Sequence, residues 1–317
     1  MLYQLAIALG SGLASAVLFL VPAKGSMAAL FFGVLAPLPL MIAALGFGPR
    51  SAGLAALTGT VTIAAVLHPY LAGAFAFSVV VPAILLGWQT LRRNTLHGRW
   101  TSPAALLIWI VVLTIAMDYA GIAVMAVRYQ SFDVAVSEFA ARLAPMVAGV
   151  LGSSDTSSVS PLEFARVMVL AMAPIAAAWG VVALTLNLWL AARIAQISGR
   201  LTRPWQSLPE NLKLPREALF FFIGALGLTL GLSDFPRILA STMAAALGMA
   251  FALYGLAVVH RRTRKTGARA GLLGALYVAI FALFPWPLVA VATAGIFDVF
   301  RPRAAVANPT SKSTEII

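Results

Sequence analysis

The sequence predicts an all-α membrane protein: a polytopic transmembrane helix bundle with about eight or nine spans and one amphipathic interfacial helix. Hydrophobic residues make up 61% of the 317 residues and charged residues only 10%, with a mean hydropathy of +0.95. A soluble domain carries about 25% charged residues. The apolar runs are long and unbroken, whereas the strands of a membrane barrel alternate in polarity over about ten residues. Helices are therefore expected to cross the bilayer.

The apolar runs divide into nine stretches near the length of a spanning helix, which is about 20 residues. Turn residues and basic residues separate them, such as Gly48-Pro49 after the second stretch and Arg92-Arg93 after the fourth. The expected spans are 2–21, 27–47, 51–67, 70–91, 103–127, 161–192, 216–232, 235–260 and 270–300. Together they form one integral membrane domain over residues 1–303.

Two of these helices carry start signals. Ser102 precedes Pro103, which fits an N-cap followed by proline at the first helical position. Ser160 and Glu163 have the spacing of a capping box, in which each side chain accepts a hydrogen bond from the other residue's backbone N–H. The second helix continues to about Ile197, so it is expected to extend beyond the bilayer.

The last apolar stretch, 270–300, allows two interpretations. Pro285-Trp286-Pro287 interrupts it near the middle. Two full crossings need about 40 residues, so the stretch is either one kinked span or two short, tilted spans. Length favours the first interpretation. The basic tail, with Arg301 and Arg303, favours the second because it would bring that tail to the cytoplasm.

Lys and Arg are concentrated in alternate loops, with fourteen in one set and five in the other. The larger set comprises Arg50, Arg92, Arg93, Arg99, Arg193, Arg200, Arg203, Lys213, Arg216, Arg261, Arg262, Arg264, Lys265 and Arg269. The smaller set comprises Lys24, Arg128, Arg142, Arg166 and Arg237. Cytoplasmic loops are enriched in these residues. The pattern predicts a multi-pass protein of the bacterial inner (cytoplasmic) membrane with a cytoplasmic N-terminus.

Residues 130–151 are predicted to form the amphipathic helix at the outer interface. Apolar residues such as Val136 and Leu143 recur at helical spacing, and polar residues such as Glu138 and Arg142 occupy the other face. This helix either covers a cavity as a lid or packs on the top of the bundle. The tail 304–317 is expected to be disordered.

Several chemistries are not expected from this sequence. Cysteine is absent and the histidines His68, His97 and His260 are far apart, so we predict no metal site and no cofactor. No P-loop or zinc-protease motif occurs, and the protein is not expected to be an enzyme or to hydrolyse ATP itself. The net charge of +12 follows from the basic cytoplasmic loops, so no nucleic-acid partner is predicted.

Candidate ligand-binding residues are the polar and aromatic side chains inside spans, because such groups are costly in hydrocarbon. Asp118, beside Tyr119, is the leading candidate for a ligand or proton role. Asn187, near Trp179, is either a ligand group or an interhelical hydrogen bond. The pair Asp234 and Arg237 begins a helix, where Asp234 also fits an N-cap. Asp298 is either a further site residue or a partner of Arg301 or Arg303 at the interface.

The first helix carries small residues at four-residue spacing: Ala6, Gly10 and Ala14, with Ala8, Gly12 and Ala16 beside them. Small residues let helix backbones approach closely in membranes. The Ala6, Gly10 and Ala14 face is therefore either a docking face for another membrane protein or an internal packing surface.

Two C-terminal motifs resemble the YybS-like family of predicted bacterial membrane proteins, a domain of unknown function. Residues 255–260 (GLAVVH) and the basic loop after them resemble the end of the family's penultimate helix. Residues 295–298 (GIFD) with Arg301 and Arg303 resemble its closing pattern, although Pro302 departs from the usual basic tail. The resemblance implies about eight membrane helices.

That family is distantly similar to the substrate-binding components of energy-coupling-factor vitamin transporters. This likeness implies a small molecule bound between helices, no ATPase in the chain, and docking through small-residue faces. It supplies no matched binding residues.

The leading functional hypothesis is a small-molecule binding or transport component of the lipid bilayer that has no ATPase of its own. It predicts a polar cavity between spans 103–127, 161–192 and 235–260. The alternative is a non-catalytic membrane scaffold or assembly protein that holds a partner and no ligand. A membrane enzyme would need a second catalytic group near Asp118, for which Asp234 and His68 are the candidates.

Overall fold

The computed structural model of the chain describes residues 2–93, 98, 100–151, 160–205 and 208–301, and the tail predicted at 304–317 lies outside them. The described residues form helices and no sheet, with one isolated bridge between Arg93 and Trp100. In order, the elements are α1 (Leu2–Leu20), η1 (Val21–Lys24), α2 (Met27–Val34), α3 (Pro37–Phe47), α4 (Pro49–Val66), α5 (Pro69–Phe75), η2 (Ala76–Val80), α6 (Val81–Leu91), α7 (Pro103–Arg128), α8 (Phe132–Leu151), α9 (Pro161–Ile197), α10 (Leu208–Asn211), α11 (Arg216–Gly231), α12 (Asp234–Thr263), α13 (Arg269–Ala282) and α14 (Trp286–Val299).

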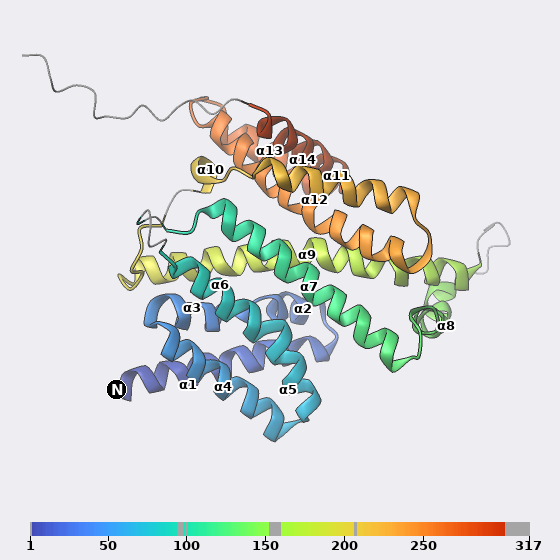
Figure 1. The fold of residues 1–317 in the computed structure, drawn as a ribbon, viewed down its shortest axis with the longest axis horizontal. Helices are drawn as coiled ribbons and strands as arrows, with labels where there is room; N and C mark the ends of the chain where they lie inside the picture. Colours follow the sequence, from blue (N-terminus) through green and yellow to red (C-terminus); the bar gives the residue numbers. More distant parts are fainter. Residues whose placement is uncertain (1, 94–97, 99, 152–159, 206–207, 302–317) are drawn as a thin grey trace, which may run out of the picture.

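The helices are arranged as two groups around a central pair (Figure 1). The N-terminal helices α1 to α6 pack against one another on one side, and α11 to α14 pack around α12 on the other. Between them lie α7 and α9, which contact each other and also contact α12. One hydrophobic core runs through both groups and includes Phe75, Ile110, Val181 and Phe251. An all-α helical membrane bundle is thereby confirmed as the fold class.

Five helical segments among the described residues are long and apolar enough to cross a membrane: Tyr3–Ala23, Pro69–Leu91, Pro103–Arg128, Pro161–Ile197 and Asp234–Thr263. Three shorter apolar helices accompany them: Phe31–Phe47, Arg269–Ala282 and Trp286–Val299. The N-cap at Ser102 and the capping box of Ser160 and Glu163 are both present. As expected, α9 continues to Ile197.

Proline explains two departures from regular spans. The stretch 27–47 is two helices rather than one, because Pro37 has no N–H to continue the hydrogen-bond ladder and its ring excludes the carbonyl four residues earlier. The segment 69–91 stays helical but widens to a π-helical turn over Ala76–Val80, just before Pro82. Such turns re-pair the backbone where proline interrupts it.

The stretch 270–300 is likewise two helices, α13 and α14, separated at Pro285. Gly255 of α12 packs on Val291 of α14, while Arg261, farther along α12, reaches Asp298, farther along α14. The two helices therefore run in the same direction. Because α13 connects the end of α12 to the start of α14, it runs in the opposite direction to both. The end of α14 therefore lies at the same end of the molecule as the end of α12. Of the two interpretations of this stretch, this path favours two short passes.

The loops predicted to share one membrane side come together at one end of the molecule. Arg203 donates hydrogen bonds to the carbonyls of Thr90 and Thr101, which precede and follow the loop between α6 and α7. Arg261 reaches the carbonyl of Pro209, and Arg200 lies over the ring of Tyr3 at the N-terminus. At the other end, Phe132 packs on Phe235. Several loops of the larger basic set therefore lie together at one end of the described structure.

The helix α8 occupies the position predicted for the amphipathic helix and packs on α9 and α7. Ala140 and Val147 form a small apolar cluster with Ala165 of α9, while Glu138 and Arg142 form an ion pair on the exposed face. This arrangement corresponds to the interpretation of α8 as a helix packed on the end of the bundle.

Candidate functional site

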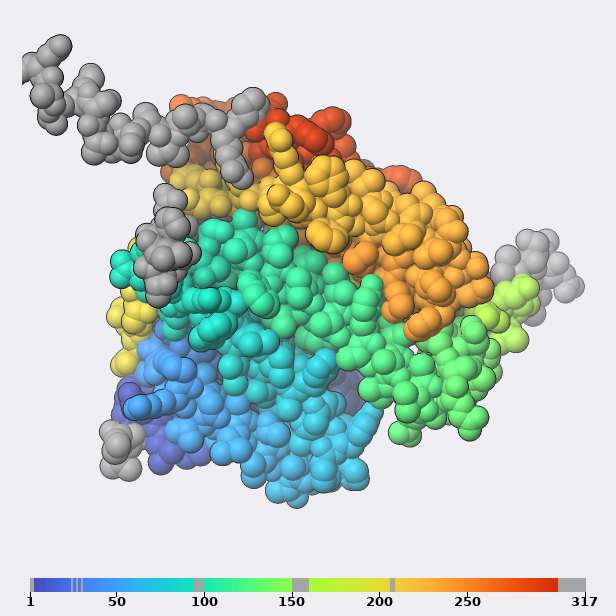
Figure 2. Space-filling model, in the orientation of Figure 1, coloured from blue at the N-terminus to red at the C-terminus, as the bar shows by residue number. Residues whose placement is uncertain are grey.

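A cavity of about 670 Å³ lies among α1, α2, α3, η2, α7 and α9. This volume is in the range of small-molecule sites in proteins, about 300–1,000 Å³. In the space-filling view the surface is hollowed between the segment before α6 (cyan) and α7 (green), with N-terminal helices visible behind it (Figure 2). Most of the lining is apolar. The lining residues are Phe19, Phe31, Gly33, Val34, Pro37, Ser78, Val79, Thr114, Met117, Asp118, Ala176, Trp179, Gly180, Ala183 and Leu184.

Two polar groups on the cavity wall have buried atoms without a partner. They are Oδ2 of Asp118 and Oγ1 of Thr114, neither of which has a hydrogen-bond partner in the described structure. The two residues are one helical turn apart on α7, so their side chains share a face. A buried polar atom without a partner costs about 1–3 kcal/mol, and more when it is charged. A donor group placed in the cavity would remove this cost.

Local backbone features bring the walls together. Gly180 allows α9 to approach α7 so closely that a Cβ at this position would lie 2.8 Å from Cγ2 of Thr114. The π-helical turn η2 places Ser78 and Val79 on the wall, although the hydroxyl of Ser78 already donates to the carbonyl of Ala74 at 2.7 Å. Among the described lining residues, the buried polar atoms without any partner are on α7.

Asn187 lies beside the cavity and is fully buried. Its Nδ2 donates to the carbonyl of Val34 at 2.8 Å and to that of Ala183 at 2.7 Å. The first of these is a carbonyl left at the break between α2 and α3. On the other side of the break, Ser15 donates to the carbonyl of Ala36 at 2.6 Å. These two hydrogen bonds correspond to the interhelical interpretation of Asn187, while its Oδ1 is buried without a partner in the described structure.

Of the remaining sequence candidates, Trp179 lines the cavity beside Asp118. Tyr119 follows Asp118 on the helix but points to another face, where its hydroxyl donates to the carbonyl of Leu239 at 2.7 Å. Asp234 and Arg237 are exposed at the start of α12, where the N-cap is Ser233. Neither residue is among those that line the cavity.

The cavity also lies on a different side from the one expected. Spans 103–127 and 161–192 supply its walls as α7 and α9, but α12 contributes none of its lining residues, which come instead from the N-terminal helices. In the described structure α12 instead packs against α9, α11 and α14, and Phe251 and Ala250 are among its buried residues. No α8 residue lines the cavity either, and His68 is an exposed N-cap that accepts from the N–H of Tyr70.

The two small-residue rows on α1 have different surroundings. Ala8, Gly12 and Ala16 are buried, and a Cβ on Gly12 would lie 2.3 Å from the carbonyl oxygen of Ala55. Ala6, Gly10 and Ala14 are exposed, and a Cβ on Gly10 would have no neighbour within 4 Å. The predicted docking row is therefore uncovered in the described structure.

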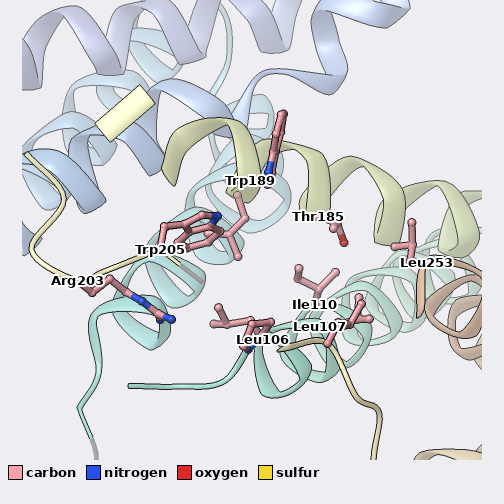
Figure 3. Close-up of a pocket in the computed structure, with 11 residues that line it drawn as sticks. Leu106, Leu107, Ile110, Thr185, Trp189, Arg203, Trp205 and Leu253 are labelled. Carbon is pink, nitrogen blue, oxygen red and sulfur yellow. The ribbon is translucent and has the colours of Figure 1, made fainter. Parts of the chain in front are cut away.

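A second cavity, of about 60 Å³, lies between α7, α9 and the segment that holds Arg203 and Trp205 (Figure 3). Its walls are mainly apolar, including Leu106 and Ile110, and it has room for little more than a few water molecules. Burial lowers the pKa of the Arg203 guanidinium, although arginine keeps its charge in proteins. The contacts of Arg203 with the carbonyls of Thr90 and Thr101 indicate a structural role for this side chain.

Sequence reasoning did not single out Thr114, Ser78 or Arg203. The position of Thr114 one turn before Asp118 is a signal that could have found it, because residues four apart share a helix face. Across the described residues no group of three or more His, Asp or Glu side chains is placed to hold a metal ion.

Comparisons with known proteins agree with this architecture. No curated protein and no solved structure matches the chain. One protein-family model matches residues 13–299, which is most of the chain, and it is described as a predicted membrane protein family, DUF2232. The chain with its helical bundle and its five long apolar helices therefore belongs to the DUF2232 family of predicted membrane proteins.

Proposed function

We propose that this protein is a small-molecule binding or transport component of the membrane that has no ATPase of its own. The observation that carries the proposal is the pair of unpartnered buried atoms, Asp118 Oδ2 and Thr114 Oγ1, on the wall of a cavity large enough for an organic molecule. Charged residues inside membrane bundles usually mark ligand or ion pathways, because burying them without purpose is costly.

The lining of the cavity favours a particular class of ligand. Three aromatic side chains, Phe19, Phe31 and Trp179, line it together with one carboxylate. Aromatic faces attract cations as well as apolar groups. The site therefore suits a molecule with an apolar body and one amine or other cationic donor, whose charge would pair with Asp118 while Thr114 accepts a further hydrogen bond.

Native mass spectrometry of the gently solubilised full chain tests this proposal. The wild type should carry a co-purifying small molecule, and Asp118→Asn should lose most of it, because a hydrogen bond to a charged group contributes about 1.5–3 kcal/mol, or roughly a 10- to 150-fold change in affinity. Asp234→Asn is the matched control, since it removes an exposed carboxylate at another place on the surface. Equal occupancy in all three proteins would contradict the proposal.

A defined probe separates charge recognition from cavity filling. Calorimetric titration with phenethylamine and with 2-phenylethanol compares two molecules of similar size, of which only the amine is cationic. We expect the amine to bind more tightly to the wild type and this preference to disappear in Asp118→Asn. Ala183→Phe, which places a large side chain on the cavity wall, should weaken both ligands.

The uncovered row of Ala6, Gly10 and Ala14 favours a second candidate, a scaffold that docks another membrane protein through α1. The same spectra distinguish the two. A protein partner with no bound small molecule would favour the scaffold, and an occupied cavity in a lone protomer would favour the binding component.

A further inference from the structure

A third cavity, of about 710 Å³, lies at the basic end of the C-terminal helices and is lined mainly by charged side chains. The first turn of α11 and the end of α14 form its walls, and Tyr254 and Arg261 of α12 also line it. Its charged lining residues are Lys213, Arg216, Arg261 and Arg301 on the cationic side and Glu210, Glu217 and Asp298 on the anionic side.

Most of the negative charge in this cavity is already compensated. Asp298, which is 9% exposed, accepts hydrogen bonds from Arg261 at 2.7 Å and from Tyr254 at 2.8 Å, and it lies 3.4 Å from Arg262. The partners of Asp298 are thus residues of α12 and not Arg301, which is one of the two partners expected from the sequence. The other expected partner, Arg303, lies outside the described residues. Glu210 forms an ion pair with Arg264. Of the three carboxylates, only Glu217 has no cation paired to it in the described structure.

Three cations remain without such a partner. The side chains of Lys213, Arg216 and Arg301 are exposed and make no hydrogen bond or ion pair with any described residue. The first turn of α11 adds to them, because Pro215 at the N-cap supplies no side-chain hydrogen bond to its free N–H groups. Helix N-termini and converging cations both favour an anion.

The cavity also borders exposed apolar surface. The partly exposed apolar residues Pro215 and Val299 belong to its lining. Farther along the same two helices, Phe220 and Phe221 of α11 are 70% and 65% exposed, and Phe297 of α14 is 68% exposed. A phospholipid would fit this arrangement. Its phosphate would lie in the cationic cavity at the interface, and its acyl chains would lie along the exposed aromatic side chains of the helices.

We propose that this cavity binds a phosphate-bearing anion, and that the anion is the headgroup of an acidic membrane phospholipid. Lys213, Arg216 and Arg301 contact the phosphate, and the N-terminal turn of α11 contributes backbone donors. The site is independent of the Asp118 cavity, because the two share no lining residue. It would stand whether or not a small molecule binds beside Asp118.

The test uses the full chain in nanodiscs containing phosphatidylglycerol or phosphatidylcholine, followed by native mass spectrometry of retained lipid. One variant carries Lys213→Gln, Arg216→Gln and Arg301→Gln. Its matched control carries Arg50→Gln, Arg193→Gln and Arg269→Gln, which removes the same charge from exposed positions of the same predicted membrane side outside this cavity. Each cation near an anionic lipid changes binding by about fivefold, so the first variant should retain phosphatidylglycerol roughly a hundredfold less well.

The outcomes separate the two sources of phosphate. Retention of phosphatidylglycerol in the wild type and the control, but not in the cavity variant, supports a lipid headgroup. Displacement of that lipid by millimolar inorganic phosphate supports the same anion site with a soluble phosphate as its ligand. Equal retention by both triple variants overturns the proposal. If the triple variant folds poorly, the single variant Lys213→Gln replaces it, because Lys213 is exposed and unpaired in the described structure. If this variant retained as much phosphatidylglycerol as the wild type, the proposal would be overturned.

Discussion

Two buried side chains replace the backbone hydrogen bonds that are missing between α2 and α3. Asn187 donates to the carbonyl of Val34, and Ser15 donates to that of Ala36. Within hydrocarbon a carbonyl has no water to accept from, so a broken helix is tolerated only where neighbouring side chains satisfy it. Because Val34 and Pro37 also line the Asp118 cavity, these two hydrogen bonds help to fix its shape.

Replacing Asn187 with leucine should destabilise the protein. The change keeps the volume but leaves the carbonyl of Val34 buried without a donor, which costs about 1–3 kcal/mol. Loss of the Asn187 Oδ1, which is buried without a partner, offsets part of this cost. Thermal unfolding in detergent should show a lower Tm than the wild type. Thr293→Ala is the control, because the Thr293 hydroxyl is exposed and donates only to Val289 of its own helix. An unchanged Tm for Asn187→Leu would contradict this role.

Only some residues of the candidate site can be predicted from the sequence one residue at a time. Asp118 and Trp179 stand out because a carboxylate and a tryptophan are conspicuous in apolar runs, and the structure places both on one cavity wall. Thr114 does not stand out, since threonine is ordinary in a span and the cavity that it lines forms only where α7 meets α9 and the N-terminal helices. Tyr119 has the same sequence neighbourhood as Asp118, yet the turn of the helix directs it to α12.

Among the helices, glycine sets which pairs pack most closely. Gly12 lies against α4, and Gly255 and Gly295 lie against each other's helices in the pair α12 and α14. A Cβ on Gly255 would lie 1.8 Å from the carbonyl oxygen of Val291. The small-residue spacing of α1 indicates close packing, but it does not indicate which of its two rows is covered. That choice depends on where α4 lies.

The two rows of α1 provide a matched pair of variants. Gly12→Ala should lower the Tm, because the added methyl group would overlap the backbone of α4 and push the helices apart, at a cost of about 1–3 kcal/mol. Gly10→Ala should leave the Tm unchanged or slightly raise it, since the position is open and alanine favours helix. If Gly10→Ala instead broke a complex seen in native mass spectra, the exposed row would be the docking face.

At the scale of the whole molecule, the positions where the chain turns between helices were predictable and the grouping of helices was not. Hydropathy and basic residues indicate where the chain turns, because these are local properties of the sequence. The central position of α7 and α9, and the separation of α12 from the Asp118 cavity, depend on side-chain packing between distant segments. The prolines indicated a break at 285, but the direction of α14 follows only from its contacts with α12.

The absence of cysteine from the sequence makes the orientation directly measurable. Single variants Ala148→Cys in α8 and Thr266→Cys after α12 place one thiol at each end of the bundle, both at exposed positions. In intact cells stripped of any outer barrier, an impermeant maleimide should label Ala148→Cys, and it should label Thr266→Cys only after permeabilisation. The reverse pattern would contradict a cytoplasmic N-terminus.

A third variant, Arg301→Cys, decides between one and two final crossings. If α13 and α14 both cross, its thiol should behave like that of Thr266→Cys. Labelling from the outside, like Ala148→Cys, would mean that the chain crosses only once after α12.

The shortness of α13 and α14 has a consequence for the surrounding bilayer. Each has 14 residues, or about 21 Å at 1.5 Å per residue, against a hydrocarbon thickness of about 30 Å. Helices that are too short draw the two leaflets toward each other, at a fraction of a kcal/mol for each ångström of mismatch. We therefore expect the bilayer to be locally thinner beside the C-terminal helices. Lipids with short acyl chains should be enriched there and lipids with long acyl chains should be depleted.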